Sequence, residues 1–583
     1  MTLSPFRSWR AIFISLLIPG FCTTLLALGP ETTAPDLTSF ERVLYVHART
    51  VTGDEETGTL DAPHSTLTAA LRNAEYGGPT AILVAAGTYK ESPLLLPADV
   101  SLFGGYDPST WKRNILASPT RLDGRAEQRI LVIEGNGIVD GFHIENGKVA
   151  GYGAGILCNG SSPVISNNFF LHNRILPPPG WNPKNRHELA FDGAAIACLN
   201  GSSPVIEKNV FAYNETVIGR GAAIAAHLHA DPRIVKNVIM HNVVGTDDPM
   251  RSSEGAISAY GFSNPLIQNN LVAMNRAENA NDAGGIFIAL WANPVIRENW
   301  ILGNYCDDDG AGLFLGGQEH RYDTPFDPVP PPEQFNVLVE RNIFMGNRNR
   351  MENSGAMRIT METRARLINN LIARNPGGVY LQRSELEVFH NTIDDPFLMI
   401  ETKHTIGPSD VQNNLILGTA DIRAPTRFVY NSARNFTYGE GNRVISDPPS
   451  LFRKDALNFP IMDQRFHPAR FQTRIDLFAE TTPTTDLSGR IIRVGEFWSL
   501  VQRHEGLRIH VWGKIPDRDP LNSTSYIEIL STYRLAEDSI AQDQGSPDTG
   551  VRVDLFGNPR PDPENPQNKP DLGAIESIAN SRK

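Results

Sequence analysis

Cysteine is scarce in this sequence, and its scarcity argues against sites that depend on sulfur. The 583 residues include four cysteines, with no Cys-x-x-Cys pair and no His/Cys spacing typical of zinc. We therefore expect neither a disulfide framework nor a zinc site.

Basic residues are also fewer than acidic residues. Lys and Arg number 53 against 65 Asp and Glu, which gives a formal net charge of −12, and no basic stripe runs along the chain. Nucleic acid is not expected as a partner, because binding to a phosphate backbone needs clustered Lys and Arg. The acidic excess by itself indicates solubility rather than a particular function.

Long apolar runs are missing beyond the N-terminus, so no later segment is expected to span a membrane. The one long run, Ala11 to Leu28, follows Arg7 and Arg10 and is interrupted by a Pro-Gly pair. This arrangement predicts a signal peptide over residues 1–35. An uncleaved anchor is the alternative, because no clean Ala-x-Ala site is visible. We expect a secreted protein, extracellular or on the cell surface, with the periplasm as a further location.

Helical periodicity is scarce as well, and a different repeat takes its place. Gly193 to Asn214 reads GAAIACLNGSSPVIEKNVFAYN, and Gly153 to Asn173 reads GAGILCNGSSPVISNNFFLHN. Three further copies follow. Each copy contains short β-branched runs separated by Gly, Asn, Ser and Pro, which predicts strand, turn, strand, turn and strand.

One position of the repeat is Asn in each copy. The interval is 21 residues from Asn370 to Asn391 and 43 from Asn299 to Asn342, so a constant coil carries loops of variable length. This pattern predicts an all-β protein, a right-handed parallel β-helix over residues 126–435. The Asn side chains are expected to stack in a ladder. The column comprises Asn168, Asn209, Asn237, Asn270, Asn299, Asn342, Asn370, Asn391 and Asn414.

Two columns of the repeat are apolar in every coil and are predicted to face the core. Cys158 and Cys198 occupy one of them on adjacent coils, where we expect them close together but unbridged, because side chains in one column point in parallel. Cys306 has no evident partner. The first column is Ile156, Ile196, Ile224, Ile257, Ile286, Leu313, Met357 and Val379, and the second is Cys158, Cys198, Ala226, Ala259, Ile288, Leu315, Ile359 and Leu381.

The two ends of the solenoid depart from the repeat. Residues 36–125 contain an amphipathic helix from Thr66 to Tyr76, with Ser65 as its N-cap, and this helix is expected to cap the open end. Residues 436–583 form a C-terminal region in which 470–534 alternate like a small antiparallel β insert. The largest loops, 174–191, 243–253 and 276–282, leave one corner of the coils.

Several short motifs resemble secreted bacterial parallel β-helix proteins of the pectate-lyase-like superfamily. They are Tyr45-Val46, the Thr59/Pro63 segment, Ala69-Ala70-Leu71, Ala85 to Tyr89, Val100 to Asp107 and Gly141-Phe142. The C-terminal end, including Asp554, Gly557, Arg560, Asp571 and Glu576, resembles the closing segment of surface β-helix proteins of the choice-of-anchor Q type. The resemblance implies the fold and not an activity, because this fold hosts lyases, hydrolases, epimerases and non-catalytic surface proteins.

Charged residues recur at the corner that carries the loops. Asp282 and Asp309 stand at equivalent positions of adjacent coils, a spacing of about 5 Å that suits a carboxylate pair in a glycosidase. Asp307, Asp308 and Asp309 offer an alternative, a Ca²⁺ site; otherwise no cofactor is expected. A third interpretation is that these are solvated turn residues, with Asp192 and Arg220 as a surface ion pair.

Aromatic residues and histidines are predicted to point outward beside this corner. The group comprises His227, His229, Tyr260, Phe262 and Trp291. An exposed aromatic patch of this kind suits stacking on sugar rings, and packing beneath the loops 243–253 and 276–282 is the alternative.

Two functions are consistent with these features. The first is a non-catalytic, secreted or surface-displayed protein that binds a polysaccharide along the outward face, with His229, Phe262 and Trp291 in contact with sugar. The second is a polysaccharide lyase or glycoside hydrolase. In that case His227 or Tyr260 would accept a proton, Arg220 would neutralise charge, and Asp282 and Asp309 would act as acid/base pair or metal ligands. We expect a monomer.

Overall fold

The computed structural model describes most of the chain between residues 28 and 577. The predicted signal peptide falls almost wholly on residues 1–27, which lie outside the described residues. Further gaps are 49–55, 76, 92, 182–190, 249–252, 318–336, 401–406, 425, 436–438, 447, 479–482, 484, 518–525 and 562–568.

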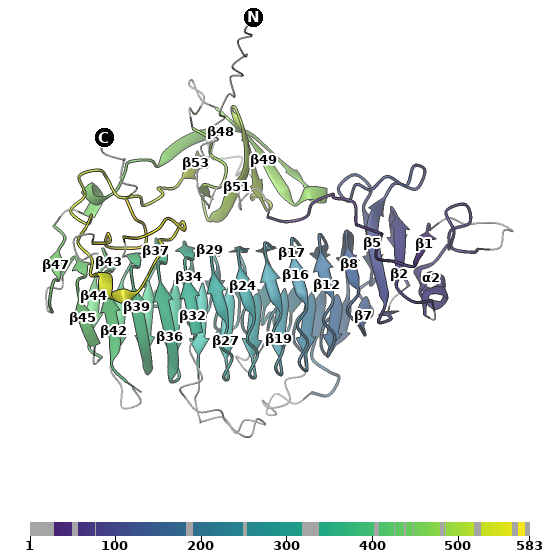
Figure 1. The fold of residues 1–583 in the computed structure, drawn as a ribbon, viewed down its shortest axis with the longest axis horizontal. Helices are drawn as coiled ribbons and strands as arrows, with labels where there is room; N and C mark the ends of the chain where they lie inside the picture. Colours follow the sequence, from purple (N-terminus) through teal and green to yellow (C-terminus); the bar gives the residue numbers. More distant parts are fainter. Residues whose placement is uncertain are drawn as a thin grey trace, which may run out of the picture.

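The chain winds into a parallel β-helix, as predicted (Figure 1). Each coil contributes one strand to each of three long parallel sheets. The first sheet has 14 strands, from β1 (Arg42–Val46) to β45 (Thr426–Val429). The second has 12, from β4 (Leu94–Leu96) to β44 (Ala420–Ile422), and the third has 14, from β3 (Gly87–Tyr89) to β47 (Arg443–Val444).

A fourth, narrower sheet was not predicted. It has seven strands, from β10 (Lys148–Ala150) to β34 (Arg348–Asn349). Its strands β14 (Arg174–Leu176), β22 (Val243–Val244) and β26 (Arg276–Ala277) lie at the start of segments that we expected to be loops. Strands of two or three residues give too little alternation to be recognised by period, so sequence patterns do not reveal them.

The two predicted core columns are confirmed in their register. Ile156 pairs with Ile196, and Cys158 pairs with Cys198, in the second sheet. Both columns belong to one apolar cluster that fills the interior of the coils. Cys158, Cys198 and Cys306 are buried and free, as expected for thiols that act as small apolar side chains.

The predicted Asn ladder is confirmed. Asn237 is fully buried; its amide nitrogen donates to Asn270 Oδ1 at 3.0 Å and to the Ile206 carbonyl at 2.9 Å. Its own Oδ1 accepts from the Asn209 side chain at 3.1 Å. Each amide thus bonds to the coils on both sides, donating to the next Asn and accepting from the preceding one, which satisfies buried polar atoms that would otherwise be costly.

A second ladder runs beside the first and was missed. It comprises Asn173, Asn214, Asn242, Asn275, Asn304, Asn347 and Asn375, and it ends on Asp395. The sequence does contain its signal, because several copies of the repeat end in Asn. Asp395 accepts from both the backbone and the side-chain nitrogens of Asn375.

A helix covers the N-terminal end of the solenoid, as predicted (Figure 1). Helix α2 (Leu67–Ala74) buries Leu67 and Leu71 against the core. The N-cap is Thr66 and not Ser65: the Thr66 hydroxyl accepts a hydrogen bond from Ala69 N at 3.1 Å. The first free amides, Leu67 N and Thr68 N, donate to the Glu91 carboxylate instead, so the helix start is completed by a distant residue.

The antiparallel insert is a closed six-stranded barrel, and it begins earlier than residue 470. Its strand order is β48-β49-β52-β51-β50-β53. The strands are β48 (Leu457–His467), β49 (Gln472–Leu477), β50 (Ile491–Val494), β51 (Phe497–Glu505), β52 (Arg508–Trp512) and β53 (Tyr526–Ile529). The alternation in β48 is interrupted by Pro460 and by charged residues, which explains why sequence patterns start the insert later.

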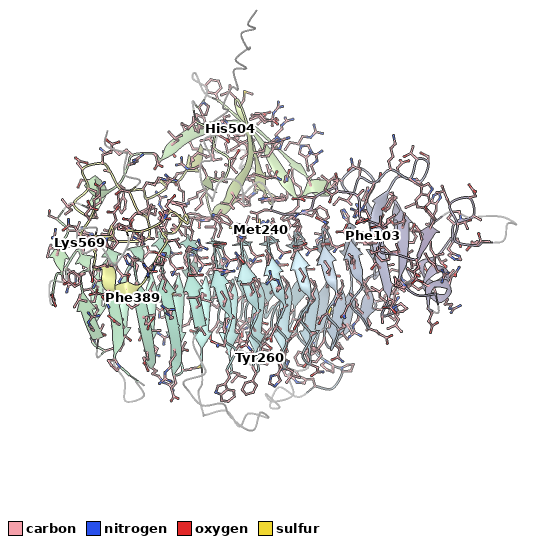
Figure 2. The ribbon with its side chains drawn as sticks, in the orientation of Figure 1. Phe103, Met240, Tyr260, Phe389, His504 and Lys569 are labelled. Atoms are coloured by element: carbon pink, nitrogen blue, oxygen red, sulfur yellow. The ribbon has the colours of Figure 1, made fainter. Side chains whose placement is uncertain are left out.

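The barrel lies on the outer face of the third sheet (Figure 1). Strands of this sheet such as β21 (Val238–Met240) are apolar at three successive positions, so that both faces are buried. Met240 packs with the barrel, whereas Ile239 packs inside the coils. Figure 2 labels Met240 on the barrel side of the solenoid and Tyr260 on the opposite side. Trp498 of the barrel lies over Gly303 and Gly346, where any side chain would collide with its indole.

The chain just after residue 27 is part of this interface. Leu28 is 4% exposed and packs in the cluster between barrel and sheet. Gly29 N donates to the Lys236 carbonyl at 3.1 Å, and Lys208 pairs with Glu31 at 2.7 Å. Cleavage of a signal peptide after residue 35 would remove the residues that form these contacts.

We expect Asn237→Ala to lower the free energy of unfolding by about 1–3 kcal/mol, because it leaves buried groups of Asn209 and Ile206 without partners. Urea denaturation of the variant and the wild type measures the difference. Asn264, an exposed residue at a turn, provides the control as Asn264→Ala. An Asn237→Ala variant as stable as this control would contradict the ladder's role.

The buried carboxyl group of Asp395 should make the stability of the protein depend on pH. Burial raises its pKa to about 7, whereas in the unfolded chain it ionises near pH ~3.9. Between these values the folded state holds a proton that the unfolded state lacks, so stability falls as pH rises, by up to ~1.4 kcal/mol per pH unit. Asp395→Asn removes this loss and should be more stable than the wild type at pH 8.

The measurement is urea denaturation at pH 5 and pH 8, with the exposed Asp538→Asn as control. The stability difference between Asp395→Asn and the wild type should grow from pH 5 to pH 8. A difference that is the same at both pH values would show that Asp395 does not titrate in this range.

Candidate functional site

The predicted charged corner lies where each coil enters the second sheet. The relevant strands are β15 (Ile196–Leu199), β19 (Ile224–His227), β23 (Ile257–Tyr260), β27 (Ile286–Ala289), β31 (Leu313–Gly316) and β35 (Met357–Thr360). Gly193, Gly221 and Gly310 open three of these coils with φ of 73°, 65° and 67°. This left-handed turn, which glycine adopts without strain, sets the charged residue before it on the corner.

Asp192 is buried at one end of the corner. It accepts hydrogen bonds from the Tyr260 hydroxyl at 2.6 Å and from Arg220 N at 2.8 Å. Burial raises the pKa of Asp192, and the pKa of Tyr260 is raised well above its ordinary value, first by burial and then by Asp192. Tyr260 therefore keeps its proton and holds Asp192, rather than acting as a proton acceptor.

Arg220 pairs with Glu254 and not with Asp192. The Arg220 Nε lies 2.7 Å from Glu254 Oε2, both side chains are nearly buried, and the guanidinium stacks over the Tyr260 ring at 4.6 Å. Burial raises the pKa of Glu254 to about 7, against the opposing charge of Arg220. The predicted surface ion pair of Asp192 and Arg220 is therefore wrong. Sequence reasoning missed Glu254 because it aligned Ser253, the preceding residue, with the charged column.

His227 is neutral and enclosed. Burial, with a smaller contribution from Arg220, lowers its pKa to about 3. Its ring stacks on Tyr260 with 3.8 Å between centroids, and its Nδ1 lies 3.9 Å from Asp192 Oδ2 without a hydrogen bond. The predicted proton acceptors, His227 and Tyr260, thus pack against each other.

The predicted exposed aromatic platform is exposed only in part. His229 is exposed and Phe262 is half-buried, whereas Trp291, Tyr260 and His227 are 2%, 4% and 7% exposed. His229 stacks on Phe262 at 5.2 Å, and Phe262 stacks on Trp291 at 5.5 Å. Equivalent side chains on adjacent coils lie one strand spacing apart, about 4.8 Å, so neighbouring rings cover each other's faces and His229 is the exposed member of the row.

Three carboxylates converge at the other end of the corner. Oxygens of Asp282, Asp308 and Asp309 lie within 4.8 Å of one another, and all three residues are partly exposed. Asp309 N donates to Asp282 Oδ1 at 2.8 Å, and Ser354 Oγ donates to Asp309 Oδ1 at 3.0 Å. The predicted proximity of Asp282 and Asp309 is confirmed, and this trio is called the acid cluster below.

Asp282 and Asp309 have different electrostatic surroundings within the acid cluster. The pKa of Asp282 is raised well above its ordinary value, first by burial and further by Glu254, Asp308 and Asp309, while the Asp309 N–H opposes the shift. On the next coil, Arg358 Nε lies 3.5 Å from Asp309 Oδ2. The cluster thus contains one carboxyl group whose pKa is raised beside one that lies against a guanidinium.

The residues predicted for a calcium site are brought together only in part. Asp308 and Asp309 lie in the acid cluster, where Asp282 joins them in a group of oxygens that could hold a metal ion. The Asp307 carboxylate is engaged elsewhere, since it accepts from the Tyr305 hydroxyl at 2.8 Å and from Ala280 N at 3.1 Å. Ca²⁺ takes six to eight oxygen ligands, so the three carboxylates would supply part of its coordination.

Comparison with known protein families gives one partial match. A family model described as a protein of unknown function, DUF1565, matches residues 51–282, which is less than half of the chain. Among curated proteins no relative matches. No helix within the described residues is long and apolar enough to cross a membrane.

Solved structures with a similar course of the chain include three that act on or bind sugars by their titles. A pectate lyase is 11% identical, covering 93% of this chain and 97% of its own, with a TM-score of 0.35. XylC in complex with xylose is 9% identical, with coverages of 92% and 98% and a TM-score of 0.41. An E. coli bacteriophage tailspike protein in complex with a pentasaccharide is 10% identical, with coverages of 81% and 92% and a TM-score of 0.27. Such low identities and scores carry no information on the substrate of this chain.

Proposed function

We propose that the protein is a secreted or cell-surface β-helix protein that binds a polysaccharide at the acid cluster and hydrolyses it. The observation that carries the proposal is the close approach, on adjacent coils, of Asp282, whose pKa is raised, and Asp309, which lies against the Arg358 guanidinium. Glycoside hydrolysis needs two carboxyl groups in different states: one carboxylic acid protonates the leaving oxygen, and one carboxylate acts as nucleophile or base.

The roles follow from the surroundings of each residue. Asp282, whose pKa is raised, is the general acid. Asp309, oriented by Ser354 and Arg358, is the carboxylate that attacks or activates water. Separations of about 5–5.5 Å between carboxyl groups are typical of retaining enzymes, and oxygens within 4.8 Å favour that outcome over inversion.

The charge of the cluster favours a neutral polysaccharide. Even with Asp282 protonated as the general acid, the two remaining carboxylates outnumber the single guanidinium of Arg358, so a uronate-rich chain would meet like charge. The same reasoning weakens the lyase alternative. A lyase needs a cation free to neutralise the substrate carboxylate, and Arg220 is already paired with Glu254 inside the protein.

Binding without catalysis is the second candidate, because all three carboxylates of the cluster lie among protein partners. Asp282 accepts a backbone N–H, and Asp309 accepts from Ser354 while lying against Arg358. A carboxylate held in this way serves equally to accept hydrogen bonds from sugar hydroxyls.

The test is a screen of neutral polysaccharides that measures new reducing ends and, separately, retention in affinity gels. The variants are Asp282→Asn and Asp309→Asn, with Asp307→Asn as matched control because its carboxylate lies outside the cluster. We expect each cluster variant to lower the rate on a responsive polysaccharide by about 10²–10⁴-fold. The control should stay within a few-fold, and the wild-type rate should fall as pH rises through the raised pKa of Asp282.

The outcomes separate the two candidates. Binding by the wild type without new reducing ends, lost in the Asp309→Asn variant, would support binding without catalysis. Neither binding nor hydrolysis by the wild type would contradict both. N-terminal sequencing of the exported protein tests secretion: a new N-terminus within residues 1–36 supports export with cleavage, and an intact N-terminus on protein found only inside the cell would contradict it.

A further inference from the structure

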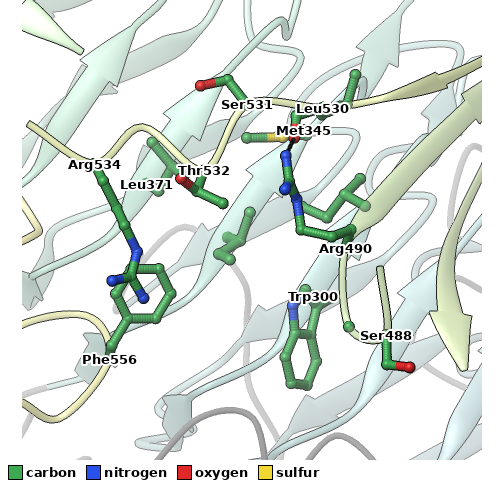
Figure 3. A pocket seen from close by; sticks show the side chains of 13 residues that line it. Trp300, Met345, Leu371, Ser488, Arg490, Leu530, Ser531, Thr532, Arg534 and Phe556 are labelled. Atoms are coloured by element: carbon green, nitrogen blue, oxygen red, sulfur yellow. Dashed lines mark hydrogen bonds between the residues drawn. The ribbon is translucent and has the colours of Figure 1, made fainter. Parts of the chain in front are cut away.

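A cavity lies at the seam between the barrel and the solenoid (Figure 3). Its volume is about 150 Å³. Its floor is the outer face of the third sheet, where Trp300 of β29 (Trp300–Leu302), Ile343 and Met345 of β33 (Ile343–Met345) and Leu371 of β37 (Leu371–Ala373) meet. This floor is apolar, and the size is that of a single aromatic ring, since a dry cavity of about 150 Å³ accommodates benzene.

The rim of the cavity is positively charged. Arg490 comes from the start of β50, Arg534 from the segment after β53, and Figure 3 shows the two on different sides of the view, with Thr532 between them. Burial lowers the pKa of Arg490, and the positive charge of Arg534 lowers it further. Two guanidinium groups therefore face one small space.

The carboxylate of Asp455, which lies near Arg490, already binds other groups of the protein. Asp455 accepts from Thr532 N at 3.1 Å and from the Thr532 hydroxyl at 2.6 Å, and it lies 3.6 Å from Arg490. Arg490 also donates to the carbonyls of Asp455 and Leu530 at 2.7 and 2.6 Å. The charge of Arg490 is thus compensated by protein groups.

Arg534 is the cation that lacks such compensation. Within the described residues its guanidinium forms no hydrogen bond or ion pair. The guanidinium carbon lies over the Phe556 ring, 4.9 Å from the ring centroid. Stacking on Phe556 orients the plane of the guanidinium and leaves its N–H groups free to donate. A planar fork of this kind binds carboxylates through two parallel hydrogen bonds.

We propose that this seam cavity is a binding site for a small aromatic carboxylate, independent of the polysaccharide site. The ring packs on Trp300, Ile343 and Leu371, and the carboxylate pairs with Arg534. Most ligand sites combine an apolar lining with a few oriented polar groups in this way. Since the walls come from both the barrel and the solenoid, the bound acid bridges the two parts.

The probe is benzoate, titrated calorimetrically into the full-length protein, with benzyl alcohol as the neutral analogue of the same shape. We expect saturable binding of benzoate and weaker binding of benzyl alcohol. Arg534→Gln should weaken benzoate about tenfold or more, the loss expected for a charge-assisted pair, and should leave benzyl alcohol unchanged. The matched control is Arg443→Gln, an exposed arginine at the far end of the third sheet.

A second variant tests the floor. Ile343→Phe fills the cavity and should abolish binding of both compounds while the far-ultraviolet circular dichroism stays that of the wild type. The proposal is overturned if the wild type shows no saturable binding of benzoate, if benzyl alcohol binds as tightly as benzoate, or if Arg534→Gln binds benzoate as the wild type does. The results with benzyl alcohol and with Arg534→Gln test the proposal even if Ile343→Phe fails to fold.

Discussion

Parallel stacking places each residue of this protein directly against its counterpart on the next coil, about 4.8 Å away. A side chain buried in such a column must therefore be a good partner for a copy of itself. Asparagine meets this condition because it carries a donor and an acceptor, and Asn237 uses both toward its neighbours. Two parallel ladders of this kind, one of them ending on Asp395, hold the corners of the coil while the loops between them vary in length.

The same constraint shapes the charged corner. Carboxylates that repeat on successive coils repel one another, and the chain relieves this by inserting Arg220 between Asp192 and Glu254. Asp282 and Asp309 instead meet directly, through a hydrogen bond from Asp309 N to Asp282 Oδ1; the pKa of Asp282 is raised, first by burial, and Asp309 lies against Arg358. The chemistry proposed for this corner thus depends on an exception to the alternation, whereas the balanced part, around Tyr260, is closed and structural.

The outer face of the third sheet adds a different kind of interaction. Apolar side chains such as Met240 and Trp300 would be exposed on an isolated solenoid, and the barrel covers them. The fit is specific, because Trp498 needs the space above Gly303 and Gly346. The fit is also incomplete, and the space that remains beside Arg490 and Arg534 forms the cavity at the seam.

Periodicity was sufficient to establish the coil, its two core columns, the first Asn ladder and the closeness of Asp282 to Asp309, because stacking turns equal positions in the repeat into spatial neighbours. It did not reveal contacts between positions that are not equivalent. Arg220 pairs with Glu254 and not with Asp192, and this depends on the side-chain rotamers. Trp291 is buried by stacking, and this depends on packing across coils. The docking of the barrel and of Leu28 joins segments hundreds of residues apart, and no local pattern encodes which face they meet. Complementary shape, formed only when the chain is folded, makes that choice.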